Sequence, residues 1–481
     1  MSEMSSIQDS LQSKLDQLEC HFTWDIKKED LGLNDILNRL EEQAKMGLGG
    51  EQGVARTHCS LGYVKFLLGR KEEALTDLLK SETLIKEKLG VNCDKNLIVT
   101  YGNFAWINYH MKNYTECESY LMKLQKIHER FSIEPSTVLD SEVLGEKGWA
   151  YLKFSRKYYD KAVEVFQKAV ELDPENSEWN AGCAKALFRT ETGTLCTVDS
   201  PAIKQLERAI EIDPDDDATR VLLGVKLLFC SKKLMNESEK MIETALNGSP
   251  EHPHVIRYVG KYFRNQGFVD RSIELLKKAV EKSPKSGFIH HQLAMCYKTK
   301  KINLLKEKRK GNWPEVNNAR NQCIYYLEKA TSIKDSFVFA MSELALQYGE
   351  KRDLPKAEKL FDRTFKTARE KNDSVHVVHY YYAEFQQYCN RREDLAIIHY
   401  TECLKVSPHT SEGERSATKL KNIAQRYLND DPDDWKANEI LGLIYQMKGE
   451  MFGDTKSYAA TSGNEEDDES LSNLCEINCK I

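Results

Sequence analysis

The sequence contains no run of about 18 apolar residues, so no membrane-spanning helix is expected. Its amino terminus, MSEMSSIQDSLQSKLDQLE, is polar and lacks the apolar centre of a secretion signal. The 13 cysteines include no C-x-x-C pair, which argues against a zinc site or a disulfide framework. Several of them, including Cys117, Cys323 and Cys403, stand where a small residue is favoured, so we expect reduced, buried thiols in a cytoplasmic protein.

Charge and motifs narrow the classes of function further. The 481 residues carry a formal net charge of -6, so an anion-binding site would have to be a local basic patch. The motifs G-x-x-x-x-G-K-[ST], H-E-x-x-H and G-x-S-x-G are absent, so we expect neither an enzyme nor a bound cofactor. The glycine-rich segment 47–53 follows no strand, and we interpret it as a loop rather than a dinucleotide-binding turn.

A repeated helical hairpin is the dominant pattern. Its clearest copy reads GWAYLKFSRKYYDKAVEVFQKAVELDPENSEWN, in which Ala150 is followed by Ala162, Ala169 and Pro174. Small residues where two helices cross, with a proline after the second helix, are typical of the tetratricopeptide repeat. Such a repeat buries its apolar face only by stacking on its neighbours, so the sequence predicts an all-α superhelix with a binding groove.

The same spacing recurs along most of the chain, from Gly62 in the first copy to Gly442 in a weak last one. We predict an N-terminal repeat subdomain with leading helices at 1–245 and a central repeat subdomain at 246–408. The latter has a basic insertion near 298–318. The remainder, 409–481, is expected to hold one extra helix, a degenerate last repeat and a solvated acidic tail around 465–469.

The first helix of each pair lines the groove, so helical spacing predicts which side chains face it. In the sixth copy these side chains are basic or titratable, with Tyr258 beside them: His254, Arg257, Lys261 and Arg264. In the seventh copy they include an aromatic and a cation, with Gln292 beside them: Phe288, His291, Met295 and Lys298. Aromatics interleaved with cations suit single-stranded nucleic acid, although the charge pattern fits equally a solvated stripe or one paired with acids.

Earlier copies add further candidates. The third copy offers Trp149, Lys153 and Tyr159, and the fourth adds Arg189. A tryptophan at this point of a repeat is ordinarily core, whereas Lys153 and Arg189 interrupt otherwise neutral or apolar helices.

Four longer strings resemble one family. They are LECHFTWDIKKEDL (18–31), YGNFAWINYHM (101–111), EKGWAYLKFSRKYYDKA (146–162) and FIHHQLAMCYK (288–298). They are similar to the interferon-induced proteins with tetratricopeptide repeats, from residue 18 nearly to the end of the chain. The resemblance implies a cytosolic antiviral protein that closes around a central positive tunnel. It would bind single-stranded viral RNA there by a triphosphorylated 5' end or a cap lacking ribose methylation, and block the translation or replication of that RNA.

The resemblance also implies roles for individual residues. Those expected at the 5' end are Arg39, Gln43, Trp149, Lys153, Tyr159 and Arg189. Those expected to hold the first nucleotides are His254, Arg257, Tyr258, Lys261, Phe288, His291 and Gln292. A basic set on the helix that would close the tunnel comprises Arg415, Lys421 and Arg426.

Some positions depart from the family pattern. Lys185 stands at an ordinarily apolar place near the cap pocket, and His254 and Ala218 replace expected tyrosines. Arg39 favours a capped end, yet the choice between cap and triphosphate stays open. A magnesium ion bridging the phosphates near Asp35 also stays open, as do oligomers with family members, contacts to translation factors and the viral target; no DNA or membrane partner is expected.

An adaptor that binds proteins without RNA is the main alternative. The two-carboxylate clamp of chaperone adaptors needs Lys and Asn at two fixed positions of a first repeat. The first copy has Cys59 and Tyr63 there, so this clamp is not reproduced.

Overall fold

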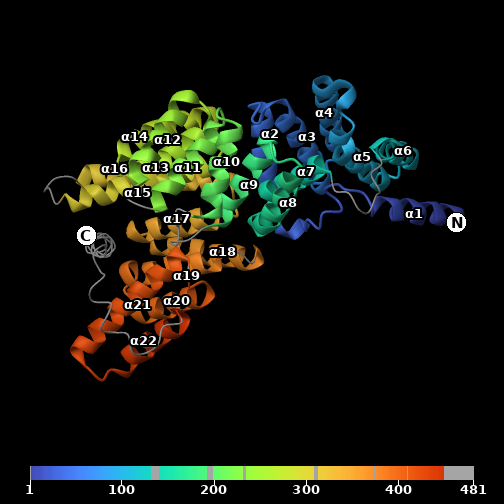
Figure 1. Cartoon of the computed structure of the whole chain (residues 1–481). Helices are drawn as coiled ribbons and strands as arrows, with labels where there is room; N and C mark the ends of the chain where they lie inside the picture. Colours follow the sequence, from blue (N-terminus) through green and yellow to red (C-terminus); the bar gives the residue numbers. More distant parts are fainter. Residues whose placement is uncertain are drawn as a thin grey trace. The chain divides into compact units, whose positions relative to one another are not determined.

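The computed structural model describes residues 2–131, 140–191, 199–230, 234–307, 313–371, 374–408 and 410–448. All regular elements in these ranges are helices (Figure 1). No helix in the described part of the chain is long and apolar enough to cross a membrane. The described residues divide into two compact units: unit 1 ends at Pro250 and unit 2 begins at Glu251.

Unit 1 contains the first twelve α-helices of the described chain. Their bounds are α1 Ser2–Leu15, α2 Leu33–Lys45, α3 Gly50–Leu67, α4 Lys71–Leu89, α5 Ile98–His110, α6 Tyr114–Phe131, α7 Ser141–Phe154, α8 Tyr159–Leu172, α9 Ser177–Thr190, α10 Pro201–Ile212, α11 Asp217–Cys230 and α12 Met235–Gly248.

Unit 2 contains the remaining described helices. Their bounds are α13 Pro253–Asn265, α14 Val269–Lys282, α15 Gly287–Lys306, α16 Trp313–Ile333, α17 Val338–Glu350, α18 Leu354–Lys371, α19 Val375–Glu384, α20 Glu393–Val406, α21 Ser411–Asp430 and α22 Trp435–Lys448. A single π-helical turn, Phe385–Cys389, follows α19.

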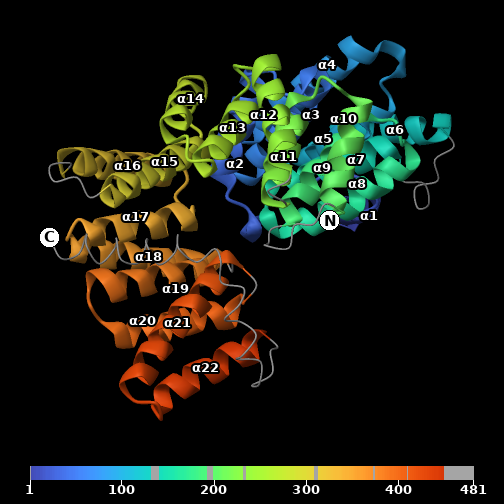
Figure 2. The ribbon, with the colours of Figure 1, turned by 60° about the vertical axis from the view of Figure 1, so that its left-hand side comes forward.

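Consecutive helices pack as antiparallel pairs, and each pair packs on the next within its unit. Figure 1 shows α7, α8 and α9 side by side in unit 1, and Figure 2 shows α19, α20 and α21 stacked in unit 2. The small residues of the repeat lie where paired helices cross: Ala162 and Ala169 are fully buried, and a Cβ added to Gly62 would lie 2.7 Å from the Leu78 side chain. This architecture is the predicted α-solenoid.

Polar caps fix where the helices begin. Asp140 accepts a hydrogen bond from the Glu142 amide at the start of α7, and Asn176 accepts from the Glu178 and Trp179 amides at the start of α9. Each cap satisfies an amide that has no partner inside the helix. Because α7 and α9 carry three of the six candidate 5'-end residues, Trp149, Lys153 and Arg189, these caps help to set the register of the site.

One local prediction needs revision. The segment 47–53 is a loop only at its start, because α3 begins at Gly50. The basic insertion at 298–318 is helical at both ends: α15 extends into it as far as Lys306, and α16 begins within it at Trp313. Residues 411–430 form α21, where the sequence predicts an extra helix. The acidic run 465–469 lies outside the described residues.

Candidate nucleic-acid interface

Two arginines from different helices donate hydrogen bonds to backbone carbonyls at the carboxyl end of α7. Arg39 on α2 donates from Nη2 to the Lys153 carbonyl at 2.8 Å, and Arg189 on α9 donates from Nη1 to the Leu152 carbonyl at 2.8 Å. The last carbonyls of a helix lack intrahelical partners and carry partial negative charge, so they hold guanidinium groups well. Gln43 follows Arg39 by one turn on α2, so the two share a face.

Lys153 lies at the same end of α7. Its Nζ is 3.5 Å from the Thr57 hydroxyl and 5.7 Å from the Trp149 ring centroid. Burial, together with the positive charges of Arg56 and Arg39, lowers the pKa of Lys153 to about 7. An ammonium group that is desolvated and crowded by cations gains strongly from an anionic partner.

Two aromatic side chains border these cations. The Tyr159 hydroxyl accepts from Arg189 Nη1 at 3.4 Å, and the Arg189 guanidinium lies 5.4 Å from the Tyr159 ring centroid. Trp149 is half-buried and meets Phe166 edge to face at 5.4 Å. Trp149 therefore packs partly as core, while the structure brings Arg39, Lys153, Tyr159 and Arg189 together around α7.

Arg56 on α3 is a neighbour that the sequence reasoning missed. It is buried, forms an ion pair with Glu178, and lies 5.5 Å from the Trp179 ring centroid. Nearby, burial raises the pKa of the Glu146 carboxyl to about 8. The only signal for Arg56 in the sequence is a charge within GVARTHCSLGYVKFL, and such a charge is ordinarily solvent-exposed.

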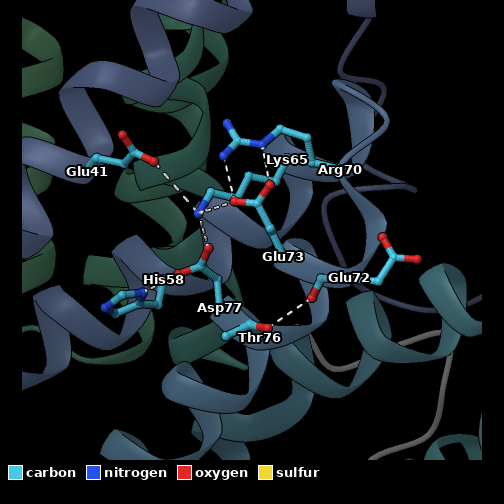
Figure 3. A network of polar contacts seen from close by, with 8 residues as sticks. All are labelled: Glu41, His58, Lys65, Arg70, Glu72, Glu73, Thr76 and Asp77. Atoms are coloured by element: carbon cyan, nitrogen blue, oxygen red, sulfur yellow. Dashed lines mark hydrogen bonds and ion pairs between the residues drawn. The ribbon is translucent and has the colours of Figure 1, made fainter.

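A polar network ties α2 to the next hairpin (Figure 3). Lys65 on α3 lies 3.7 Å from Glu41 on α2 and 2.6 Å from Asp77 on α4. His58 Nδ1 approaches Asp77 at 2.8 Å, and Glu73 lies 3.9 Å from Lys65. Because Glu41 stands between Arg39 and Gln43 in sequence, this network helps to fix the helix that presents both.

Unit 2 presents the predicted cationic and aromatic stripe on α13 and α15, which pack together. The Arg257 guanidinium lies 4.7 Å from the Tyr258 ring centroid and 5.1 Å from that of Phe288. His254 and Lys261 share the half-buried face of α13, and burial lowers the pKa of Lys261. Of the predicted set on α13, Arg257 therefore lies beside two aromatic rings.

His291 and Gln292 belong to a more enclosed part of the stripe. His291 Nδ1 is buried without a hydrogen-bond partner among the described residues, and burial lowers the pKa of His291 to about 4. Gln292 accepts from Arg264 Nη1 through its amide oxygen at 2.8 Å. That bond leaves the amide nitrogen of Gln292 available as a donor.

The three basic residues of α21 do not share one face. Arg415 and Arg426 are eleven residues apart, about three turns, whereas Lys421 is rotated by about 240° from Arg415. All three are exposed, and Arg426 forms an ion pair with Glu393 on α20. The geometry therefore brings at most two of them to one surface.

No metal centre is preformed in the described part of the chain. None of its groups of three or more His, Cys, Asp or Glu residues is placed to hold a metal ion. The Asp35 carboxylate, near which a bridging magnesium ion stays a prediction, lies 3.3 Å from Arg39 Nε.

Comparisons with known proteins match a single repeat of the chain and also most of its length. A family model described as tetratricopeptide repeat matches residues 141–176. The antiviral innate immune response effector IFIT1 of Homo sapiens is 34% identical over 449 residues, which cover 92% of this chain and 93% of that relative. The chain belongs to the interferon-induced proteins with tetratricopeptide repeats. Another such relative, interferon-induced protein with tetratricopeptide repeats 2 of Homo sapiens, is 30% identical, covering 92% of this chain and 93% of the relative.

Solved structures of this family agree with the fold. The human IFIT1 dimer with m7Gppp-AAAA matches with a TM-score of 0.80 at 31% identity, covering 98% of this chain and 99% of that one. The human IFIT1 dimer with PPP-AAAA matches with a TM-score of 0.77 at 32% identity, covering 92% of this chain and 96% of that one. The predicted family and fold class are confirmed.

Proposed function

We propose that this interferon-induced tetratricopeptide-repeat protein binds single-stranded RNA by its 5' end and blocks translation or replication of that RNA in the cytoplasm as an antiviral effector. The observation that carries the proposal is the convergence of Arg39, Lys153 and Arg189 at the carboxyl end of α7. The two structures of one human relative, IFIT1, with m7Gppp-AAAA and with PPP-AAAA support it.

The side chains suit binding rather than catalysis. Lysine and arginine form charge-assisted hydrogen bonds with phosphate oxygens, and a site poor in water strengthens each contact. On unit 2, Phe288 and Tyr258 offer ring faces of the kind on which RNA bases stack. We propose no enzymatic step and no organic cofactor; a magnesium ion near Asp35, and closure around a tunnel, remain predictions.

The test is fluorescence polarisation with one RNA sequence carrying four different 5' ends. These are hydroxyl, triphosphate, a cap without ribose methylation and a cap with it. Tight binding to the triphosphate or the unmethylated-ribose cap, weak binding to the hydroxyl, and a steep loss with salt would support a 5'-end binder. Equal weak binding to all four would favour the protein-binding adaptor instead.

Affinity for triphosphate RNA should fall as the pH rises from 7 to 9. Phosphate binds protonated Lys153, whose pKa of about 7 lies far below the ordinary value of 10.5, so the free protein loses this charge in that window. Glu146, with a pKa of about 8, gains negative charge over the same range. We expect a loss of up to about tenfold per pH unit. The window avoids the last ionisation of the phosphate, near pH 6.

The pH series should be run at constant ionic strength. Glu146→Gln removes one of the two titrating groups and should flatten the profile. An affinity that stays constant from pH 7 to 9 would contradict the assignment of Lys153 to phosphate binding.

Replacing Phe288 with alanine should weaken binding of all RNA ends by roughly tenfold, because loss of one stacked base costs about 1–3 kcal/mol whatever the base or end group. The matched control is Phe268→Ala, at an exposed ring in the same unit. Polarisation with purine and pyrimidine RNAs checks this. A loss confined to one base composition would argue against simple stacking.

A further inference from the structure

Two lysine side chains of the protein lie close to the Trp149 ring. Lys153 on α7 and Lys185 on α9 place their Nζ atoms 5.7 and 5.9 Å from its centroid. The face of an indole ring attracts cations within about 6 Å. Much of the attraction that Trp149 could offer to a cationic ligand is therefore already satisfied by these two ammonium groups.

Lys185 is held in this position by a carboxylate at the start of α11. Its Nζ lies 3.2 Å from Asp216 Oδ2, and Asp216 also accepts from the amide of Thr219 at 3.0 Å and from its hydroxyl. Burial alone would raise the pKa of Asp216, but the charge of Lys185 and the bonds from Thr219 lower it overall. Asp216 therefore stays ionised at neutral pH and fixes Lys185.

The balance of charge at this end of unit 1 is positive. Lys185 is matched by Asp216, and Arg39 is matched by Asp35 at 3.3 Å. Lys153 and Arg189 are held instead by neutral partners: the Thr57 hydroxyl for Lys153, the Leu152 carbonyl and Tyr159 hydroxyl for Arg189.

The nearby carboxyl groups do not reverse this balance. Glu178 forms an ion pair with Arg56, so these two charges offset each other. Burial raises the pKa of Glu146 to about 8, which leaves most of that carboxyl uncharged at pH 7. Lys153, with a pKa of about 7, is about half protonated at pH 7, and Arg189 adds its charge, so a group that enters beside Trp149 meets an excess of positive charge.

This electrostatic setting discriminates between RNA ends. Methylation at N7 gives the guanine of a cap a positive charge, whereas an unmethylated guanine is neutral and a triphosphate is anionic. We propose that Lys185, held by Asp216, is a specificity-determining residue that selects against an N7-methylated cap and makes the 5'-triphosphate the preferred end. The proposal rests on the function proposed above, since it assumes that the RNA end lies beside Trp149.

The test uses the full chain and one RNA with four ends: hydroxyl, triphosphate, Gppp and m7Gppp. Gppp and m7Gppp differ only in the methyl group and its charge. The wild type should bind triphosphate most tightly and Gppp roughly tenfold more tightly than m7Gppp. This ratio is a fraction of the bare repulsion between two unit charges at this range, because water and salt screen them.

Two substitutions at Lys185 separate charge from shape. Lys185→Met should close or reverse the gap between Gppp and m7Gppp, because it removes the cation beside the ring and leaves the Asp216 carboxylate without it, while keeping much of the side-chain volume. Lys185→Arg keeps the charge and should keep the discrimination. Lys204→Met, at an exposed lysine 3.4 Å from Asp199 on the same unit, is the matched control and should behave as the wild type.

Each outcome has one meaning. Equal affinities of the wild type for Gppp and m7Gppp would overturn the proposal, as would a gap that survives in Lys185→Met. Equal binding of all four ends, hydroxyl included, would instead overturn the proposed function itself. Circular dichroism of each variant shows whether it is folded. If Lys185→Met does not fold, Asp216→Asn gives a second test: it releases the charge of Lys185 and should widen the gap.

Discussion

Replacing Arg189 with alanine is expected to weaken binding of 5'-triphosphate RNA by roughly a hundredfold or more. The guanidinium is positioned in advance by the Leu152 carbonyl and the Tyr159 hydroxyl, so little side-chain entropy is lost on binding. Truncating one member of a buried charge pair costs about 2–5 kcal/mol, much of it from the partner left unpaired. Here that partner would be a phosphate group carrying full negative charge.

The effect should be measured by polarisation titration at fixed salt, with Arg208→Ala as the matched control. Arg208 lies on α10 of the same unit, is exposed, and forms ion pairs with Glu175 and Glu211. The control should bind as the wild type, and RNA with a hydroxyl end should lose far less affinity in the Arg189 variant. An Arg189→Ala protein that is folded and binds triphosphate RNA normally would exclude this site.

Replacing Phe166 with alanine should destabilise unit 1 by about 3–5 kcal/mol. The ring is fully buried on α8 between glycines of the two neighbouring helices: a Cβ added to Gly148 would lie 2.9 Å from it, and one added to Gly182 would lie 2.4 Å from it. Because the backbones approach the ring so closely, alanine would leave a cavity that rigid helices cannot readily fill. Trp149 would also lose its edge-to-face partner.

Urea unfolding followed by circular dichroism provides the measurement, and Leu172→Ala provides the control. Leu172 is on the same helix and is 57% exposed, so its truncation should change stability by no more than about 0.5 kcal/mol. If the two variants unfolded at the same urea concentration, Phe166 would not be the packing centre that the geometry indicates.

The fold could be predicted from the sequence because the repeat constrains a few residues very strictly. Only small side chains fit where paired helices cross, so Ala162, Ala169 and Gly260 mark the register with little ambiguity. Helical spacing also places Arg257 and Phe288 on the groove-facing sides of two neighbouring helix pairs. In the structure the guanidinium of Arg257 lies 5.1 Å from the Phe288 ring centroid. The family resemblance extended these inferences to α2.

The rest depends on contacts that no local pattern encodes. The ion pair of Arg56 with Glu178 joins residues 122 positions apart, and the bond from Arg39 to the Lys153 carbonyl joins residues 114 positions apart. The extension of α15 into the basic insertion, as far as Lys306, has no signal in the repeat spacing, although lysine is a good helix former. The grouping of Lys421 with Arg415 came from the family resemblance, whereas helical spacing places Lys421 on another side of α21.

The buried cysteines give this protein a native set of reporters of local opening. Cys59, Cys117, Cys183, Cys323 and Cys403 are buried in successive parts of the chain. Burial raises the pKa of Cys183 and Cys403 to about 12. Because alkylation needs the thiolate, these side chains react only when the surrounding helices separate locally. Since stacked repeats contact only their neighbours, each thiol should react at a rate set by its own part of the stack. Mass spectrometry of alkylated peptides would therefore map stability along the unmodified chain, and would show which repeats an RNA end makes rigid.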